Sequence, residues 1–280
     1  MSRIVPVVSF CSFLLALLVG ILLSVSSVTA QDTSNSERSA AAIAVLRRVL
    51  DASGGISSIA AIRDAVATGT LSTAMSLKET KESSVTISMR GREQLRMDSE
   101  EPTGTRSMFY NHGGVSSKDE HGAIASLGSR DAMSSISHFF PLQHYVAALN
   151  DPSYSVIELD PSMDEQSGHT LYHLRLQRTE TENVESLHRA RTSIALDYYI
   201  DATSDCIVRV QNRHSDRGMT PTNRDPFEIY QFSDYRAEHG ILLPHQITVW
   251  LEKRLISTIN ITGYQLNTGL NESHFTPAQK

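Results

Sequence analysis

The chain opens with a long apolar run. Residues 7–25 are mostly apolar, and the only charged side chain before them is that of Arg3. The short residues Val28-Thr29-Ala30 follow, as expected at a signal-peptidase site. This order predicts a secretory signal peptide over residues 1–30, cleaved after Ala30, and a periplasmic or secreted mature protein. The alternative is an uncleaved anchor, because the run of about 19 residues is close to the roughly 20 that span a bilayer.

The first segment of the mature chain has the apolar spacing of a helix. Apolar residues recur three and four positions apart, at Ala42, Val45, Leu46, Val49 and Leu50. The pair Gly54-Gly55 follows, and glycine commonly ends a helix. A short second helix is predicted over 56–65, because Ile59 and Ile62 lie three residues apart.

Farther along, the period of the apolar positions changes to two. Val85, Ile87 and Met89 alternate with polar residues, which is typical of a half-buried strand. Further strands are predicted over 94–97, 105–110, 154–159, 170–176, 192–200, 207–210, 227–235, 242–251 and 255–264, with polar loops over 161–167 and 213–225. Short strands joined by hairpin turns predict a large antiparallel sheet or an open barrel.

Residues 132–150 interrupt this strand pattern. Their apolar positions fall on one helical face, at Met133, Ile136, Phe139, Phe140, Leu142, Tyr145, Val146 and Leu149. Pro141 lies inside the segment and should kink or split the helix. The helix is either core, packed on the sheet, or a mobile lid over a pocket. The predicted fold is therefore α+β: a large antiparallel open half-barrel covered by an N-terminal helix and this central helix.

Composition and charge narrow the classes of function. After cleavage the chain keeps 24 of its 25 basic residues and all 31 acidic ones, a net charge of −7. This balance argues against nucleic acid as a partner, since nucleic-acid binding needs concentrated positive charge. Residues 31–280 are predicted to form a single domain. Only Cys206 remains, so no internal disulfide can form, and its apolar neighbours predict a buried, inert thiol.

Motifs for catalysis or metal binding are weak. His169 and His173 have a ligand-like spacing, but in a strand they would lie roughly 13 Å apart. His138 and His144 lack a nearby acid pair. The sequence has no Gly-x-Ser-x-Gly nucleophile turn and no phosphate-binding loop. We therefore expect no enzyme activity, no metal and no cofactor. A hydrolase is a remote alternative, which a cluster of His112, His121, Ser129 and Asp131 around one pocket would favour.

Several short motifs together resemble the LolA/LolB-like superfamily of periplasmic lipoprotein-sorting and lipid-binding proteins. They are Ala52-Ser53-Gly54-Gly55 after the first helix, Gly91-Arg92-Glu93-Gln94-Leu95-Arg96-Met97, Tyr235-Arg236-Ala237-Glu238-His239-Gly240-Ile241-Leu242-Leu243-Pro244-His245-Gln246-Ile247, and the closing stretch 259–277. The resemblance implies an open half-barrel whose apolar concave face is plugged by helices. It also implies carriage of a lipid, an acylated protein or another apolar ligand. Unlike LolB, the chain has no lipobox, so the resemblance does not extend to membrane anchoring.

The leading functional hypothesis is an exported, non-enzymatic carrier of an apolar small molecule or of lipoprotein acyl chains. After cleavage it would have peripheral or no membrane association. Ligand-binding candidates are Met133, Ile136, Phe139, Phe140, Tyr145, Leu149, Ile247, Val249 and Trp250. Alternation along the strand puts Val249 and Trp250 on opposite faces, so at most one of them faces the cavity. The second hypothesis is an envelope sensor or protein-interaction module with the same fold.

Overall fold

The computed structural model describes residues 37–76, 79–112, 114–127, 139–165, 167–178, 195–213 and 227–278. The chain divides into two units, Met1–Asn35 and Ser36–Lys280. The predicted signal peptide, the candidates Met133 and Ile136, and most of the predicted 213–225 loop lie outside the described residues. Of the helices in the described part, none is long and apolar enough to cross a membrane.

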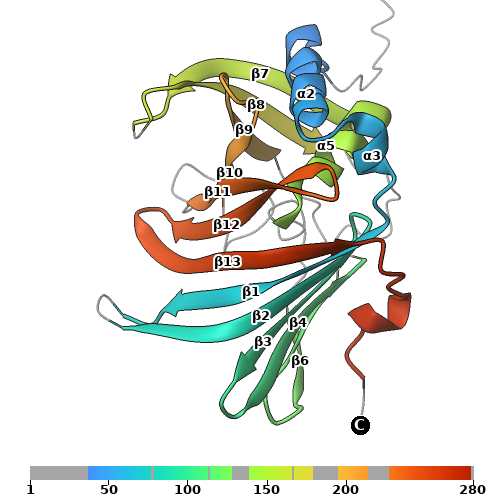
Figure 1. Ribbon diagram of the computed structural model, residues 1–280, viewed down its shortest axis with the longest axis vertical. Coiled ribbons are helices and arrows are strands. Elements are labelled where there is room, and N and C mark those ends of the chain that lie inside the picture. Colours follow the sequence, from blue (N-terminus) through green and yellow to red (C-terminus); the bar gives the residue numbers. More distant parts are fainter. Residues whose placement is uncertain are drawn as a thin grey trace, which may run out of the picture. The chain divides into compact units, whose positions relative to one another are not determined.

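One antiparallel sheet of 13 strands forms the body of the second unit in the described residues (Figure 1). Its strands are β1 Asp64–Ala74, β2 Thr80–Arg90, β3 Gln94–Glu101, β4 Gly104–Asn111, β5 Gly114–Lys118, β6 Ile124–Leu127, β7 Tyr154–Met163, β8 Thr170–Arg178, β9 Ala195–Asp201, β10 Ile207–Arg213, β11 Phe227–Glu238, β12 Ile241–Leu251 and β13 Arg254–Leu266. The spatial order is β6-β5-β4-β3-β2-β1-β13-β12-β11-β10-β9-β8-β7. Two hairpin series therefore meet where the first strand pairs with the last. This arrangement confirms the predicted large antiparallel sheet.

The junction of β1 and β13 contains a bulge. The register shifts between Thr68 and Gly69, so that Gly69 lies opposite Ile261. A Cβ atom on Gly69 would lie only 2.1 Å from the carbonyl oxygen of Asn260. Glycine is therefore required here for the two backbones to approach each other.

One face of the sheet and three helices share a hydrophobic core. The predicted inward residues of β2, Val85, Ile87 and Met89, are all buried. Helix α2 (Ala40–Ala52) buries the five residues that its spacing predicts, and α3 (Ile56–Ala60) and α5 (Pro141–Asn150) pack beside it. Burying each large aliphatic side chain stabilises the fold by about 1.5–3 kcal/mol. A 3-10 helix, η2 (Glu272–Phe275), lies against β3 and β4.

Several element boundaries differ from the sequence prediction. The second helix ends at Ala60, and the predicted helical residues Asp64 and Ala65 instead begin β1. Strand β1 was missed because its inward residues are small and the bulge at Gly69 interrupts its alternation. Strands β5 and β6 were missed because both are short and largely polar or exposed. Strand β7 extends to Met163, into the predicted 161–167 loop; Pro161 is tolerated because β7 is an edge strand.

In the predicted central segment the described helix begins at the proline, and residues 132–138 lie outside the described residues. Helix α5 begins at Pro141, and Phe140 before it has a non-helical backbone. Proline fits the first position of a helix because the amide hydrogen that it lacks would have no intrahelical partner there. Pro141 therefore starts α5 rather than kinking it from within.

Candidate ligand-binding face

Aromatic side chains link α5 to the sheet on the core side. The ring of Tyr145 lies 4.9 Å from that of Tyr198 on β9, edge to face. Phe139, just before α5, meets Tyr230 on β11 in a similar arrangement with the ring centroids 6.2 Å apart. Such edge-to-face pairs are favourable beyond the area that they bury. The face between α5 and strands β9–β12 is therefore apolar and aromatic.

The structure brings most of the described ligand-binding candidates into this core. Phe139, Phe140, Tyr145, Ile247 and Val249 are buried members of one hydrophobic cluster. A further candidate, Leu149, packs against the cluster from α5 while keeping partial exposure. Whether these residues contact a ligand stays a prediction.

Val249 and Trp250 follow the alternation expected along β12. Val249 belongs to the buried core face, whereas Trp250 is half-buried and adjacent to it in the strand. Successive residues of a strand point to opposite faces of the sheet. Trp250 therefore lies on the face away from α5, and Val249 is the one of the pair that faces the core.

Polar contacts fix α5 against its neighbours. The side-chain amide nitrogen of Gln143 donates to the carbonyl oxygens of Ile59 at 2.8 Å and Ile62 at 3.1 Å. On the adjacent position, Nδ1 of His144 lies 2.5 Å from the Tyr198 hydroxyl. His144, a weak metal candidate by sequence, therefore packs against Tyr198 of β9.

Arg38 closes the carboxyl end of α5, and sequence reasoning missed it. Its guanidinium donates to the carbonyl oxygens of Leu149, Asp151 and Tyr154 at 3.1–3.2 Å. The segment around it pairs with β7, where the Ser39 amide donates to the Val156 carbonyl at 2.8 Å. A basic side chain at the last carbonyls of a helix satisfies acceptors that the helix leaves open. Nothing in the polar run at residues 31–38 distinguished Arg38 beforehand.

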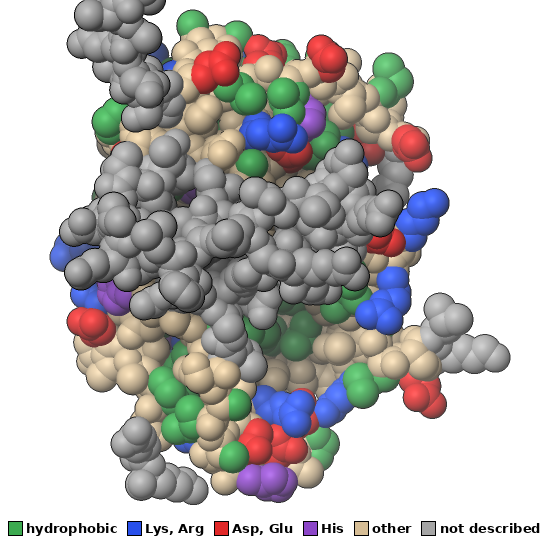
Figure 2. All heavy atoms as spheres, turned by 180° about the vertical axis from the view of Figure 1, so that it is seen from behind, with side chains coloured by type: hydrophobic (Ala, Val, Ile, Leu, Met, Phe, Trp, Pro, Cys, Tyr) green, Lys and Arg blue, Asp and Glu red, His purple; other side chains and the backbone are tan. Residues whose placement is uncertain are grey.

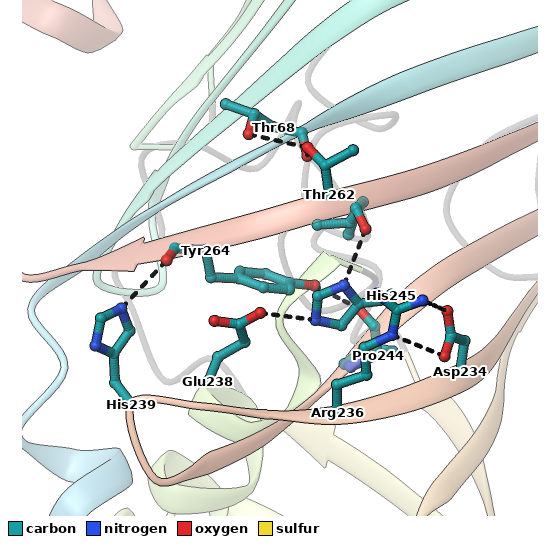
Figure 3. Close-up of polar contacts among 10 residues, drawn as sticks. Thr68, Asp234, Arg236, Glu238, His239, Pro244, His245, Thr262 and Tyr264 are labelled. Atoms are coloured by element: carbon teal, nitrogen blue, oxygen red, sulfur yellow. Dashed lines mark hydrogen bonds and ion pairs between the residues drawn. The ribbon is translucent and has the colours of Figure 1, made fainter.

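A buried histidine fixes the β11–β12 hairpin to β13 (Figure 3). His245 is 2% exposed, and its Nδ1 donates to the Ile261 carbonyl at 2.9 Å. Its Nε2 lies 3.1 Å from a carboxylate oxygen of Glu238. The Tyr264 hydroxyl donates to the Pro244 carbonyl at 2.6 Å, and burial raises the pKa of this hydroxyl. These contacts tie β11, β12 and β13 together, so we assign the residues to structure.

Ionisable groups on β8–β10 lie on the opposite face. Arg175 donates two hydrogen bonds to Asp197, and the His173 ring stacks on Tyr199 with centroids 4.3 Å apart. Burial alone would raise the pKa of Asp197, but hydrogen bonds from Arg175 and His173 outweigh burial and lower the pKa. His169 has a separate partner, Asp201, at 2.7 Å. The two histidines with ligand-like spacing therefore contact different carboxylates.

Other candidates for chemistry are scattered in the described residues. His112 pairs with Glu93, and His121 lies in a turn closed by Asp119; Ser129 and Asp131 fall outside the described part. No three His, Cys, Asp or Glu side chains gather as a metal site within the described ranges. Cys206 is half-buried rather than fully buried, and desolvation raises the pKa of its thiol, which keeps it weakly nucleophilic.

Figure 2 shows a hollow on the rear of the molecule with hydrophobic side chains at its floor. A large sheet with one apolar face needs cover on that face. The described cover is provided by short helices at one side of the sheet, where α2 and α5 contact β7. The arrangement suits apolar contact more than acid–base chemistry.

Comparison with known proteins identifies the fold. No family model matches the sequence, and no curated protein matches it. A putative outer membrane lipoprotein-sorting protein domain from Vibrio parahaemolyticus is similar in structure, with a TM-score of 0.54 and 12% identity, covering 84% of this chain and 95% of that one. A DUF1329 family protein from Desulfovibrio piger is similar with a TM-score of 0.53 and 10% identity, covering 86% and 98% of the two chains.

A LolA superfamily protein from Nitrosomonas europaea gives a TM-score of 0.53 at 11% identity, covering 82% of this chain and 97% of that one. These identities are too low to carry function, but the likeness spans nearly the whole of each relative. The resemblance drawn from the sequence motifs is thus confirmed at the level of architecture, and the chain has the fold of LolA superfamily proteins.

Proposed function

We propose that this chain is an exported, non-enzymatic carrier of an apolar ligand in the cell envelope. The observation that carries the proposal is the difference in polarity between the two faces of the sheet. One face is apolar and contacts α5 through aromatic side chains, while the ionisable groups of β8–β10 lie on the other face. Concave apolar surfaces with few polar groups are the usual sites for apolar small molecules. The ligand class is a lipid or the acyl chains of a lipoprotein.

Two further points support the proposal. The fold is that of proteins described as lipoprotein-sorting and LolA-like. The apolar run at residues 7–25, with short residues before the predicted cleavage site, is typical of a secretory signal. Export would place the carrier in the periplasm or outside the cell, where lipids need a shielded route between membranes.

The proposal is tested by binding of a neutral apolar probe. Mature protein stripped of bound lipid by organic solvent and refolded is titrated with N-phenyl-1-naphthylamine, and fluorescence is followed. The proposal predicts saturable binding near one site per chain, displaced by lipid acyl chains. Binding that never saturates, or that lysozyme reproduces at equal concentration, would contradict it and favour the protein-interaction hypothesis.

A further inference from the structure

One buried hydroxyl in the apolar core lacks a hydrogen bond. Tyr145 is 0% exposed, and its hydroxyl finds no hydrogen-bond partner among the residues that the structure describes. It points from α5 into the same cluster that holds Phe139 and Val249. Leaving a hydroxyl buried and unpaired costs about 1–3 kcal/mol, so each such group in a folded protein calls for an explanation.

The hydroxyls of three neighbouring tyrosines each have a hydrogen-bond partner. The Tyr198 hydroxyl lies 2.5 Å from Nδ1 of His144. The Tyr235 hydroxyl donates to the Ile207 carbonyl at 2.5 Å, and that of Tyr264 donates to the Pro244 carbonyl at 2.6 Å. Tyr145 therefore departs from the pattern that these three residues follow.

The environment of Tyr145 determines the chemistry that it could meet. Burial raises the pKa of its hydroxyl well above the usual value, and the nearby Tyr198 and Tyr235 raise it further. The group is therefore a neutral donor at any physiological pH. Its partner must be an acceptor that can be buried among aromatic rings at low cost. A neutral carbonyl meets this condition, whereas an ionised carboxylate would need a paired cation.

We propose that the Tyr145 hydroxyl donates a hydrogen bond to the ester or amide carbonyl of a bound acyl chain. This inference rests on the proposed carrier function and specifies its ligand. The hydrocarbon part of the ligand would occupy the apolar face, and the carbonyl would lie at Tyr145. Acyl chains in lipids and lipoproteins are joined through such carbonyls, while free hydrocarbons have no acceptor. Tyr145 thereby selects acyl ligands over plain hydrocarbon.

The test compares two probes of equal chain length, methyl palmitate and hexadecane. The affinity of each probe is measured by its displacement of N-phenyl-1-naphthylamine from the wild-type protein, from Tyr145→Phe and from the control Tyr235→Phe. The Tyr145→Phe protein should bind methyl palmitate about tenfold more weakly, the effect of one hydrogen bond, and hexadecane with unchanged affinity. Tyr235→Phe removes a hydroxyl that already has a partner, so the preference for methyl palmitate over hexadecane should remain.

A second readout does not depend on affinity. The carbonyl stretching band of bound, isotope-labelled methyl palmitate should lie at lower frequency in the wild-type protein than in Tyr145→Phe. Tyr145→Phe should also keep or raise the melting temperature, because it removes an unpaired buried hydroxyl.

The outcomes separate the two proposals. Equal affinity of the wild-type protein and Tyr145→Phe for methyl palmitate would overturn the role of Tyr145 and leave the carrier function standing. A fall in melting temperature would also overturn it, because the hydroxyl would then have a partner in the ligand-free protein. Failure of the wild-type protein to bind either probe would overturn both.

Discussion

The backbone of Gly54 lies directly against that of Gly240. A Cβ atom on Gly54 would lie 2.4 Å from the Gly240 carbonyl oxygen, and Gly54 has a φ of +118°. Beside it, the Leu242 amide donates to the Ser53 carbonyl at 3.0 Å. Two of the motifs that carried the family resemblance, one after α2 and one in the β11–β12 hairpin, thus meet in space.

Replacing Gly54 by alanine should strongly destabilise the fold. The backbone conformation alone costs a non-glycine residue about 1–3 kcal/mol, and the new methyl group would also force the hairpin away from α2. Gly55→Ala is the matched control: its φ is +94°, but a Cβ there would meet no other described atom within 4 Å. Urea unfolding should therefore show a larger loss of unfolding free energy for Gly54→Ala. Equal losses would mean that the close approach contributes nothing.

Removing the Arg38 guanidinium should loosen α5. The Arg38→Ala variant loses hydrogen bonds to three carbonyl groups. We expect a decrease of about 1–3 kcal/mol in unfolding free energy and faster amide hydrogen exchange in the last turn of α5. Arg47→Ala, on the exposed side of α2, serves as the control. Unchanged exchange in α5 would show that its docking depends on packing alone.

Alanine substitutions of Phe139 and Phe140 test whether the central helix is part of the core or a lid. Both are buried beside α5, which Gln143 and His144 also hold in place. We therefore expect the helix to be part of the core. Each substitution by alanine should lower the unfolding free energy by about 3–5 kcal/mol and weaken probe binding to a similar degree. Thermal unfolding and probe titration of the same variants provide the comparison. A large loss of binding with little loss of stability would instead identify a lid.

Asp197 should make stability depend on acid pH. Its folded pKa is lowered by Arg175 and His173 despite the opposing effect of burial. A carboxyl group with a depressed folded pKa stabilises the fold above its unfolded pKa of about 3.9. That stability is lost as the pH falls through the folded value. Melting temperatures from pH 6 downward should decline less steeply below about pH 4 in Asp197→Asn, whereas exposed Asp51→Asn should behave like the wild-type protein.

Periodicity in the sequence predicted the parts of the fold that pack through large side chains. The predictions of the five buried residues of α2 and of the inward face of β2 were both correct, because each apolar pattern is long and regular. Strand β1 was missed, since its small inward residues and the bulge at Gly69 weaken the alternation. Pairing of β1 with β13 joins residues about 200 positions apart, and no local pattern encodes such a contact.

The sequence predicted which apolar residues belong to the candidate site but not how they are arranged in space. Phe139, Tyr145 and Val249 share one core cluster, as the amphipathic patterns suggested. The missing hydrogen bond of Tyr145 depends on where neighbouring hydroxyls find partners, which only the tertiary structure determines. Arg38 likewise acts on carbonyls more than 100 residues away. A single basic residue in a polar run carries no sign of such a contact.

The most direct test of the carrier function is mass spectrometry of the mature protein purified from its native envelope without detergent. The protein is weighed intact under native conditions and then extracted with organic solvent, and the extract is analysed. If the protein is a carrier, we expect a stoichiometric lipid or acyl species that is carried by the folded protein and released on extraction. An empty protein that also fails to take up N-phenyl-1-naphthylamine would contradict the carrier function.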